Sequence, residues 1–202
     1  MLEDDIAPTA AWREFRPDVG RGASAHRVSL WPAVTAGLLI WSCLAAGCSP
    51  ALDWREVRTE GGGLTAWLPC KPDRRVRELP LEGAPLRFEL LSCTADNSTW
   101  GIASAAVDDG AIGGALRALR AARLRNLDGR ELSVQPLELK GVAPRPEMSR
   151  FAVAGRRPDG SEVVEHAVVF AHGGRVFHAA VLGGSPSAQA LETFFDNLRP
   201  AP

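Results

Sequence analysis

The fold is decided by residues 162–182, EVVEHAVVFAHGGRVFHAAVL. Two apolar runs flank Gly173-Gly174, a pair that accepts the positive φ angles of a two-residue hairpin turn. We therefore predict two antiparallel strands, Glu162–His172 and Arg175–Leu182. Near the turn both faces of these strands are largely apolar, which indicates a sheet that is covered on both sides.

The hairpin register separates the histidines. A two-residue turn places His172 opposite Arg175 and Val169 opposite His178, and directly opposed residues share a face. His178 then lies on one face of the sheet, whereas His166 and His172 lie on the other. His166 and His172 are roughly 20 Å apart along their strand, at about 3.3 Å per residue. We therefore predict no shared metal site and interpret each as an ordinary strand histidine.

Shorter runs of strand character precede this hairpin, and Gly, Pro, Asn and Asp residues punctuate them. The expected segments are a short amphipathic start over Asp53–Arg58 and strands over Leu64–Leu68, Arg74–Leu79 (an edge strand), Leu86–Leu90, Thr99–Val107 and Met148–Arg156. The strands before residue 108 are expected to form one antiparallel meander. We expect Trp67 and Trp100 in the core, whereas Trp54 has no assigned place.

Two helices are predicted, over Ala111–Asn126 and Ser187–Leu198. Asp108 and Asp109 are interpreted as caps of the first helix, and Ser187 or Ser185 as the cap of the second. Arg123 falls near the apolar stripe of the first helix, so we expect its stem along the surface and its guanidinium in water. A solvated helix face is favoured over contact of these arginines with anionic lipid head groups. The whole pattern predicts one α+β domain, a mostly antiparallel sheet covered by helices.

Two segments resemble PsbP-like domains. Residues 63–72, GLTAWLPCKP, are similar to the opening strand and Pro-rich turn of that family. Residues 175–181, RVFHAAV, followed by 192–198, ETFFDNL, are similar to its last strand and helix. The resemblance spans most of residues 54–199 and implies an α/β/α sandwich with a non-catalytic binding or assembly role. Asn197 replaces a usually small residue, and a cysteine pair is not general in the family.

The N-terminal part resembles a bacterial lipoprotein signal. Residues 28–47 carry no charge and end in Ala46-Gly47, directly before Cys48. Small residues there give the signal peptidase access to the backbone, and the cysteine thiol would receive the diacylglycerol. Ala45 departs from the pattern, because Leu is usual at that position. The alternative is a retained membrane span, since roughly 20 apolar residues can cross a bilayer.

These expectations divide the chain at Cys48. Residues 1–47 would be a tail with the signal peptide, or with a single anchor, and residues 48–202 the exported domain. Residues 1–27 hold five acids, which is unusual for a signal, and translation from Val19 would leave a short basic start. Ser49 after the cysteine is compatible with sorting to an outer membrane rather than an inner one.

Charge and cysteine content agree with export. Residues 48–202 hold 19 basic and 19 acidic residues, and this balance argues against nucleic acid as a partner. With Cys43 lost and Cys48 lipidated, Cys70 and Cys93 remain as a pair in an oxidising compartment, where we predict a disulfide. The alternative is two buried small hydrophobic residues. No metal and no cofactor are predicted.

The functional hypothesis is a membrane-tethered, non-catalytic envelope lipoprotein that carries acyl chains on Cys48 and acts in assembly or binding with an envelope protein partner. The first alternative is a module that binds a small ligand in a pocket between sheet and helix. The second is a hydrolase, which would need His166 joined to an acid such as Glu165 or Glu162. Glu165 should face away from His166 and Glu162 lies two pleats away, so a non-enzymatic role is favoured.

Overall fold

The computed structural model describes residues 52–81 and 83–201. Cys48, the apolar segment 28–47 and the candidate start at Val19 lie outside the described residues. Within the described ranges, no helix has both the length and the apolar character that a membrane crossing needs.

The centre of the fold is an antiparallel sheet of seven strands. Their spatial order is β3-β4-β5-β9-β8-β7-β6, so that β5, which precedes the first long helix, pairs with β9 near the C-terminus. The bounds are β3 Asp73–Leu81, β4 Ala84–Ala95, β5 Ser98–Ala106, β6 Arg130–Pro136, β7 Ser149–Arg156, β8 Glu162–His172 and β9 Arg175–Leu182.

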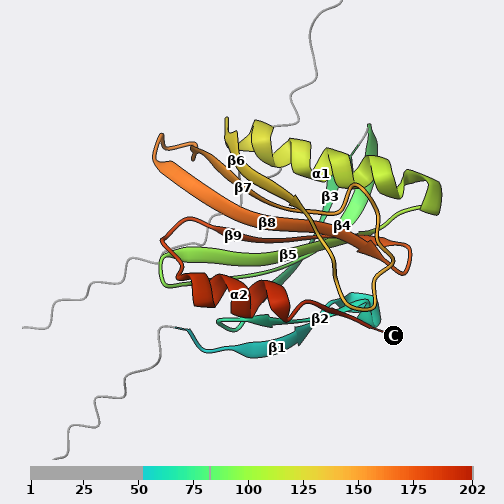
Figure 1. The fold of residues 1–202 in the computed structure, drawn as a ribbon, viewed down its shortest axis with the longest axis horizontal. Coiled ribbons are helices and arrows are strands. Elements are labelled where there is room, and N and C mark those ends of the chain that lie inside the picture. Colours follow the sequence, from blue (N-terminus) through green and yellow to red (C-terminus); the bar gives the residue numbers. More distant parts are fainter. Residues whose placement is uncertain (1–51, 82, 202) are drawn as a thin grey trace, which may run out of the picture.

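The other elements lie on the two faces of this sheet. Helix α1 covers one face, and helix α2 lies over the opposite face beside a second, three-stranded antiparallel sheet of order β1-β2-β10 (Figure 1). The bounds are α1 Ile112–Asn126, α2 Ala188–Asp196, β1 Arg55–Arg58, β2 Leu64–Leu68 and β10 Arg199–Pro200, with short 3-10 turns at Glu60–Gly62 and Asp109–Ala111. The protein is therefore a mostly antiparallel α+β fold, as predicted.

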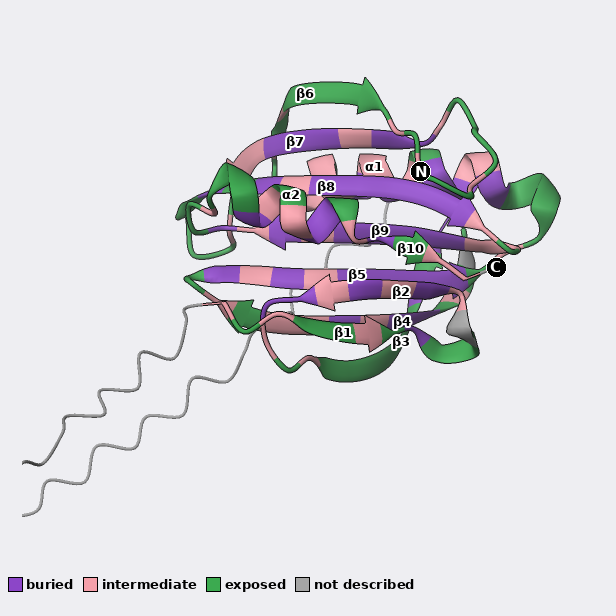
Figure 2. Ribbon diagram, turned by 60° about the horizontal axis from the view of Figure 1, so that its bottom comes forward, coloured by how far each residue is buried: buried purple, intermediate pink, exposed green. Residues whose placement is uncertain are grey.

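The predicted hairpin register is confirmed. His172 lies opposite Arg175 and Val169 opposite His178 in the β8–β9 pair. The two strands are buried over most of their length, as is β5, whereas β6 is an exposed edge (Figure 2). Covering layers on both faces explain why the hairpin is apolar on both sides.

An aromatic cluster joins the large sheet to the layer below it. Trp100 on β5 is fully buried, and its ring meets those of Phe194 on α2 and Trp54 edge-on, with centroid separations of 5.5 and 5.7 Å. Edge-to-face contact at this distance is favourable. Trp54, which had no predicted place, therefore packs against the core. The prediction for Trp67 was wrong, because it is only half-buried.

Three further predictions are corrected. Strand β2 is not part of the meander of β3, β4 and β5, because it pairs with β1 and β10 in the small sheet. Residues 130–136, which were given no element, form edge strand β6 against β7. Asp108 occupies the N-cap position of the 3-10 turn before α1, but its side chain accepts no capping hydrogen bond. Ser187 does cap α2, since its hydroxyl accepts from the Ala190 N–H at 3.1 Å.

Cys70 and Cys93 form the predicted disulfide. It links the segment between β2 and β3 to the body of β4, across a sequence separation of 23 residues. The Cα atoms are 5.9 Å apart, within the usual range for a disulfide. The bond ties the end of the small sheet to the large one.

Candidate functional site

A buried ionic network lies between α1 and the large sheet. Glu165 on β8 is fully buried, and Arg123 on α1 donates from Nε to both carboxylate oxygens at 2.8 and 2.9 Å, with a further contact from Nη2. Nε2 of His178, on β9, lies 3.3 Å from Oε1 of Glu165 but outside hydrogen-bonding geometry. Arg123 and His178 thus converge on one carboxylate.

The network keeps Glu165 ionised. Burial alone would raise the pKa of Glu165, but attraction to Arg123, together with the contacts from His178 and Arg123, lowers that pKa to about 2. A carboxyl group with this pKa is a poor proton donor near neutral pH, because a catalytic acid needs a pKa close to the working pH. Glu165 therefore acts as a fixed negative charge.

A hollow of about 90 Å³ lies over this network. Arg123, Glu165 and His178 line it together with Thr99 and Gly101. The rest of its wall is apolar and consists of Leu90, Leu91, Ile102, Ala103, Ala180 and Leu182. Several lining residues are only partly buried, so the hollow is open to solvent at its rim.

Strand register explains why the hollow forms here. Ala103 lies opposite His178, and Gly101 lies opposite Ala180, so these residues share the face of the sheet that α1 covers. Gly101 has no side chain, and Ala103 and Ala180 have only a methyl group, which leaves space that larger residues would fill. The apolar hollow is therefore a consequence of residue size on two central strands.

The partners of Glu165 and Arg123 differ in part from those predicted. Glu165 does face away from His166, as predicted, but it meets His178 on the neighbouring strand. The expectation for Arg123 was wrong: the side chain is only 12% exposed and its guanidinium binds Glu165 rather than water. A Glu on the same face as the apolar residues of β8 was the signal that a buried cation had to be nearby, because buried charges need partners.

The remaining histidine and metal predictions can now be placed. His166 is partly buried, and desolvation followed by repulsion from Arg150 lowers the pKa of its imidazole, which favours the neutral form. Among the residues that the structure describes, no group of His, Cys, Asp or Glu side chains is arranged to hold a metal ion.

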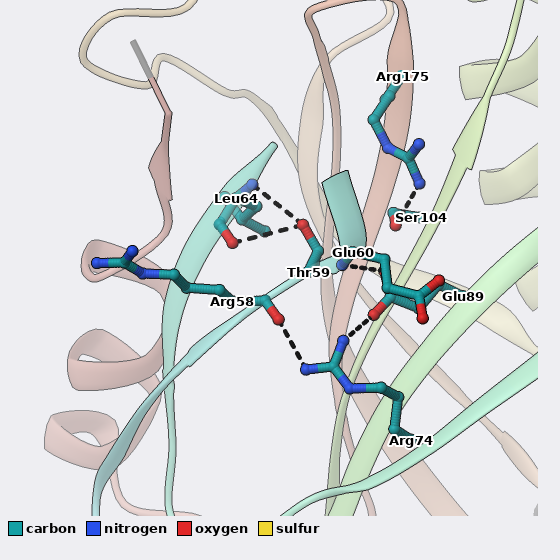
Figure 3. Close-up of polar contacts among 8 residues, drawn as sticks. All are labelled: Arg58, Thr59, Glu60, Leu64, Arg74, Glu89, Ser104 and Arg175. Atoms are coloured by element: carbon teal, nitrogen blue, oxygen red, sulfur yellow. Dashed lines mark hydrogen bonds and ion pairs between the residues drawn. The ribbon is translucent and has the colours of Figure 1, made fainter. Parts of the chain in front are cut away.

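A second ionic cluster lies on the opposite face, between the small and large sheets (Figure 3). Glu89 on β4 is 4% exposed and accepts from the backbone N–H of Glu60 at 2.6 Å and from Arg74 on β3. Arg74 also donates to the carbonyl oxygen of Arg58 at 2.8 Å. These bonds connect β4 and β3 to the chain that leaves β1, so we interpret the Glu89 cluster as a link between the two sheets.

A hollow of about 350 Å³ borders the Glu89 cluster. Arg175 and Arg87 line it together with Glu60 and Glu89. Arg175 donates from Nη2 to Ser104 at 3.2 Å, while its Nε is buried without a hydrogen-bond partner among the described residues. Two arginines and two glutamates line this hollow, and one of the glutamates, Glu89, is already paired with Arg74.

Comparison with known proteins leaves the family open: no protein-family model matches this chain, and no curated protein matches it either.

Proposed function

We propose that the protein is an exported, lipid-anchored, non-catalytic module that docks an envelope protein partner through the hollow over Arg123, Glu165 and His178. The lipid would be attached at Cys48, and the fold would be a PsbP-like α/β/α sandwich. A sheet with covering layers on both faces supports the sandwich fold. The Cys70–Cys93 disulfide supports export, because such bonds persist in oxidising compartments.

The docking proposal rests on the composition of the hollow. Its wall is apolar, and its floor is an ion pair whose two charges neutralise each other. Arg123 already engages both oxygens of Glu165, so the floor offers little unmet charge to a polar substrate. Leu90, Ala180 and Leu182 at the partly buried rim offer apolar surface. The binding free energy of a group that enters the hollow therefore comes chiefly from the removal of apolar surface from water, at about 0.8 kcal/mol for each buried methylene.

The size of the hollow favours a protein side chain over a free ligand. Its volume is about 90 Å³, whereas an engineered cavity of about 150 Å³ holds one benzene molecule. An aliphatic side chain of Val or Leu size fits the smaller space. A single buried anchor of this kind is typical of the centre of a protein interface.

The chemistry of the floor supports a non-catalytic role. A general acid–base pair needs one group whose pKa lies near the working pH, and the low pKa of Glu165 makes it a permanent anion. Thr99 contributes the one hydroxyl among the lining side chains. We therefore assign Glu165 and Arg123 the task of holding α1 over the sheet, which sets the shape of the hollow.

Site-specific photo-crosslinking tests the docking proposal. A photoreactive residue is placed at Thr99 in the full chain in its native host, with Ala180 as wild type or as Ala180→Leu, which fills the hollow. We expect one discrete protein adduct that Ala180→Leu abolishes. The control Ala106→Leu makes the same change at an exposed position of β5 and should leave the adduct intact. An adduct that survives Ala180→Leu contradicts docking in the hollow, and so does a lipid or small-molecule adduct.

Intact mass tests the anchoring proposal separately. Protein extracted from its native membranes should have a mass that starts at Cys48 and includes acyl chains. A mass that retains residues 1–47 without acyl groups would support the single membrane anchor instead.

A further inference from the structure

The described chain enters the domain at one end of the large sheet. Asp53 donates its backbone N–H to the Pro69 carbonyl at 2.8 Å, and Trp54 packs on Trp100 near the start of β5. Figure 1 shows the start of β1 at the same end as the β4–β5 and β7–β8 turns. The described chain therefore begins at this end.

The same end contains a hollow of about 560 Å³, the largest described here. It lies where α1 ends, where the β7–β8 turn begins and where β9 runs into Gly183-Gly184. A hydrogen bond of 3.0 Å from the Ser98 hydroxyl to the Gly183 carbonyl joins it to the start of β5. The hollow and the start of the described chain thus lie at the same end of the large sheet.

Three arginines line this hollow: Arg130, Arg156 and Arg157. Its acidic residues are Asp128 and Glu162, which leaves a positive balance. Glu162 is 3.9 Å from Arg156, and both side chains are largely exposed, so this pair is weak. In the described part of the chain, neither Arg130 nor Arg157 forms an ion pair with a carboxylate within 4 Å, although Arg157 attracts the carboxylate of Asp159. Guanidinium groups match phosphate geometry with two parallel hydrogen bonds.

Four of the residues that line this hollow are glycines, Gly129, Gly155, Gly183 and Gly184. At Gly129 an added Cβ would lie 2.6 Å from Val153 Cγ1, and at Gly155 it would lie 2.7 Å from Leu127 Cβ. Gly183 and Gly184 both have positive φ, which L residues rarely adopt. These glycines therefore allow close packing of the chain around the hollow, and Arg157 Nη2 lies where a Cβ on Gly183 would be.

The proposed anchor at Cys48 would hold this end of the domain close to the membrane. Four peptide links separate Cys48 from Leu52, so these residues are at most ~14 Å apart. The head-group layer is about 5–8 Å thick on each side of a bilayer. An acylated Cys48 would hold the entry end of the domain against that layer, with Arg130, Arg156 and Arg157 beside it.

We propose that this arginine-lined hollow binds the phosphate of an anionic phospholipid head group, so that the lipid anchor and the hollow together fix the orientation of the domain on the membrane. The inference rests on the proposed anchoring at Cys48. The chemistry it requires is a phosphate ester, which free phosphate would share, and the experiment separates the two sources.

The test uses the full chain carrying Cys48→Ser, in a maltoside detergent, so that its outcome does not depend on acylation. Backbone amide shifts of Gly129, Gly155, Gly183 and Gly184 are followed by NMR during titration with dihexanoyl phosphatidylglycerol, inorganic phosphate or uncharged dihexanoylglycerol. We expect saturable shifts with the anionic lipid, weaker binding of phosphate and none of the uncharged lipid.

Charge variants complete the test. Each arginine near a membrane surface contributes about fivefold in affinity, so Arg130→Gln should weaken binding about fivefold and Arg130→Gln/Arg157→Gln about 25-fold. Arg130 is exposed, so its single variant keeps the test valid even where the double variant is unstable. Arg77→Gln/Arg145→Gln, outside the hollow, is the matched control and should leave affinity unchanged.

Three results would overturn the proposal. Equal affinity for inorganic phosphate would make this a site for a free anion, and equal shifts with dihexanoylglycerol would indicate acyl-chain binding. Equal losses of affinity in the Arg130→Gln variant and in the control pair would mean that binding depends on the overall charge of the protein and not on this hollow. If the mass measurement excludes acylation while head-group binding persists, the anchoring proposal fails and the binding site stands.

Discussion

Arg123 donates to both carboxylate oxygens of Glu165, although the two residues lie 42 positions apart on α1 and β8. The carboxylate is fully buried and the guanidinium nearly so. Taking two charges out of water costs several kcal/mol for each, and their attraction repays this cost only with good geometry. The pair therefore fixes where α1 sits on the sheet, and with it the shape of the proposed docking hollow.

Removing one member of this pair should destabilise the fold strongly. Glu165→Leu takes away the buried acidic partner of Arg123, which should lower the free energy of unfolding by about 3–5 kcal/mol. The double variant Arg123→Met/Glu165→Leu replaces the pair with apolar groups and should recover most of that loss. Urea denaturation of the wild type, both single variants and the double variant gives the coupling energy. A double variant as unstable as the sum of the singles would contradict a direct pair.

Stability should fall in acid because of Glu165. The native pKa of about 2 lies below the ordinary value of 4.5, so this carboxylate stabilises the fold fully above about pH 4.5. The contribution is lost as the pH falls from 4.5 towards 2, and amounts to about 3 kcal/mol.

Denaturation of the wild type and of Glu165→Gln between pH 6 and pH 2.5 measures this contribution. The wild type should lose more stability than Glu165→Gln over this interval. Parallel curves would show that other carboxylates cause the acid sensitivity.

Local sequence pattern predicted most elements but not their assembly. The β8–β9 register follows from Gly173-Gly174, because a two-residue turn leaves one pairing. The pairing of β5 with β9 joins residues far apart in the chain, and no turn specifies it. Strand β2 looked like part of the meander because apolar residues alternate there in the same way in either sheet. Residues 130–136 carry exposed side chains along an edge strand, so apolar patterning gave no signal.

The candidate site was only partly accessible from sequence. Glu165 and Val169 lie on one face of β8, and this could be deduced from strand alternation. Arg123 could not be assigned to Glu165, because that contact depends on the crossing of α1 over the sheet. Cys70 and Cys93 were the simplest case, since the proposed export and an even cysteine count left one pairing.

The disulfide should contribute measurably to stability. Closing a loop over a sequence separation of 23 residues is worth about 3 kcal/mol in the chain-entropy model. Cys70→Ala/Cys93→Ala should lose about this amount relative to the oxidised wild type. Dithiothreitol should lower the unfolding midpoint of the wild type and leave that of the double variant unchanged. An effect of dithiothreitol on both proteins would mean that the Cys70–Cys93 bond is not its target.

Close backbone packing at the end of α1 gives a prediction about glycine. At Gly155 on β7, an added Cβ would lie 2.7 Å from Leu127 Cβ and 3.1 Å from Gly129 Cα, and these neighbours cannot move without shifting the backbone. Gly155→Ala should therefore cost about 2 kcal/mol by overpacking, or about 4–8 °C in the melting temperature. Gly110→Ala is the matched control, because its Cβ would have nothing within 4 Å, and it should change the melting temperature little. Equal melting temperatures for the two variants would mean that the β7 backbone and the end of α1 are not tightly packed at Gly155.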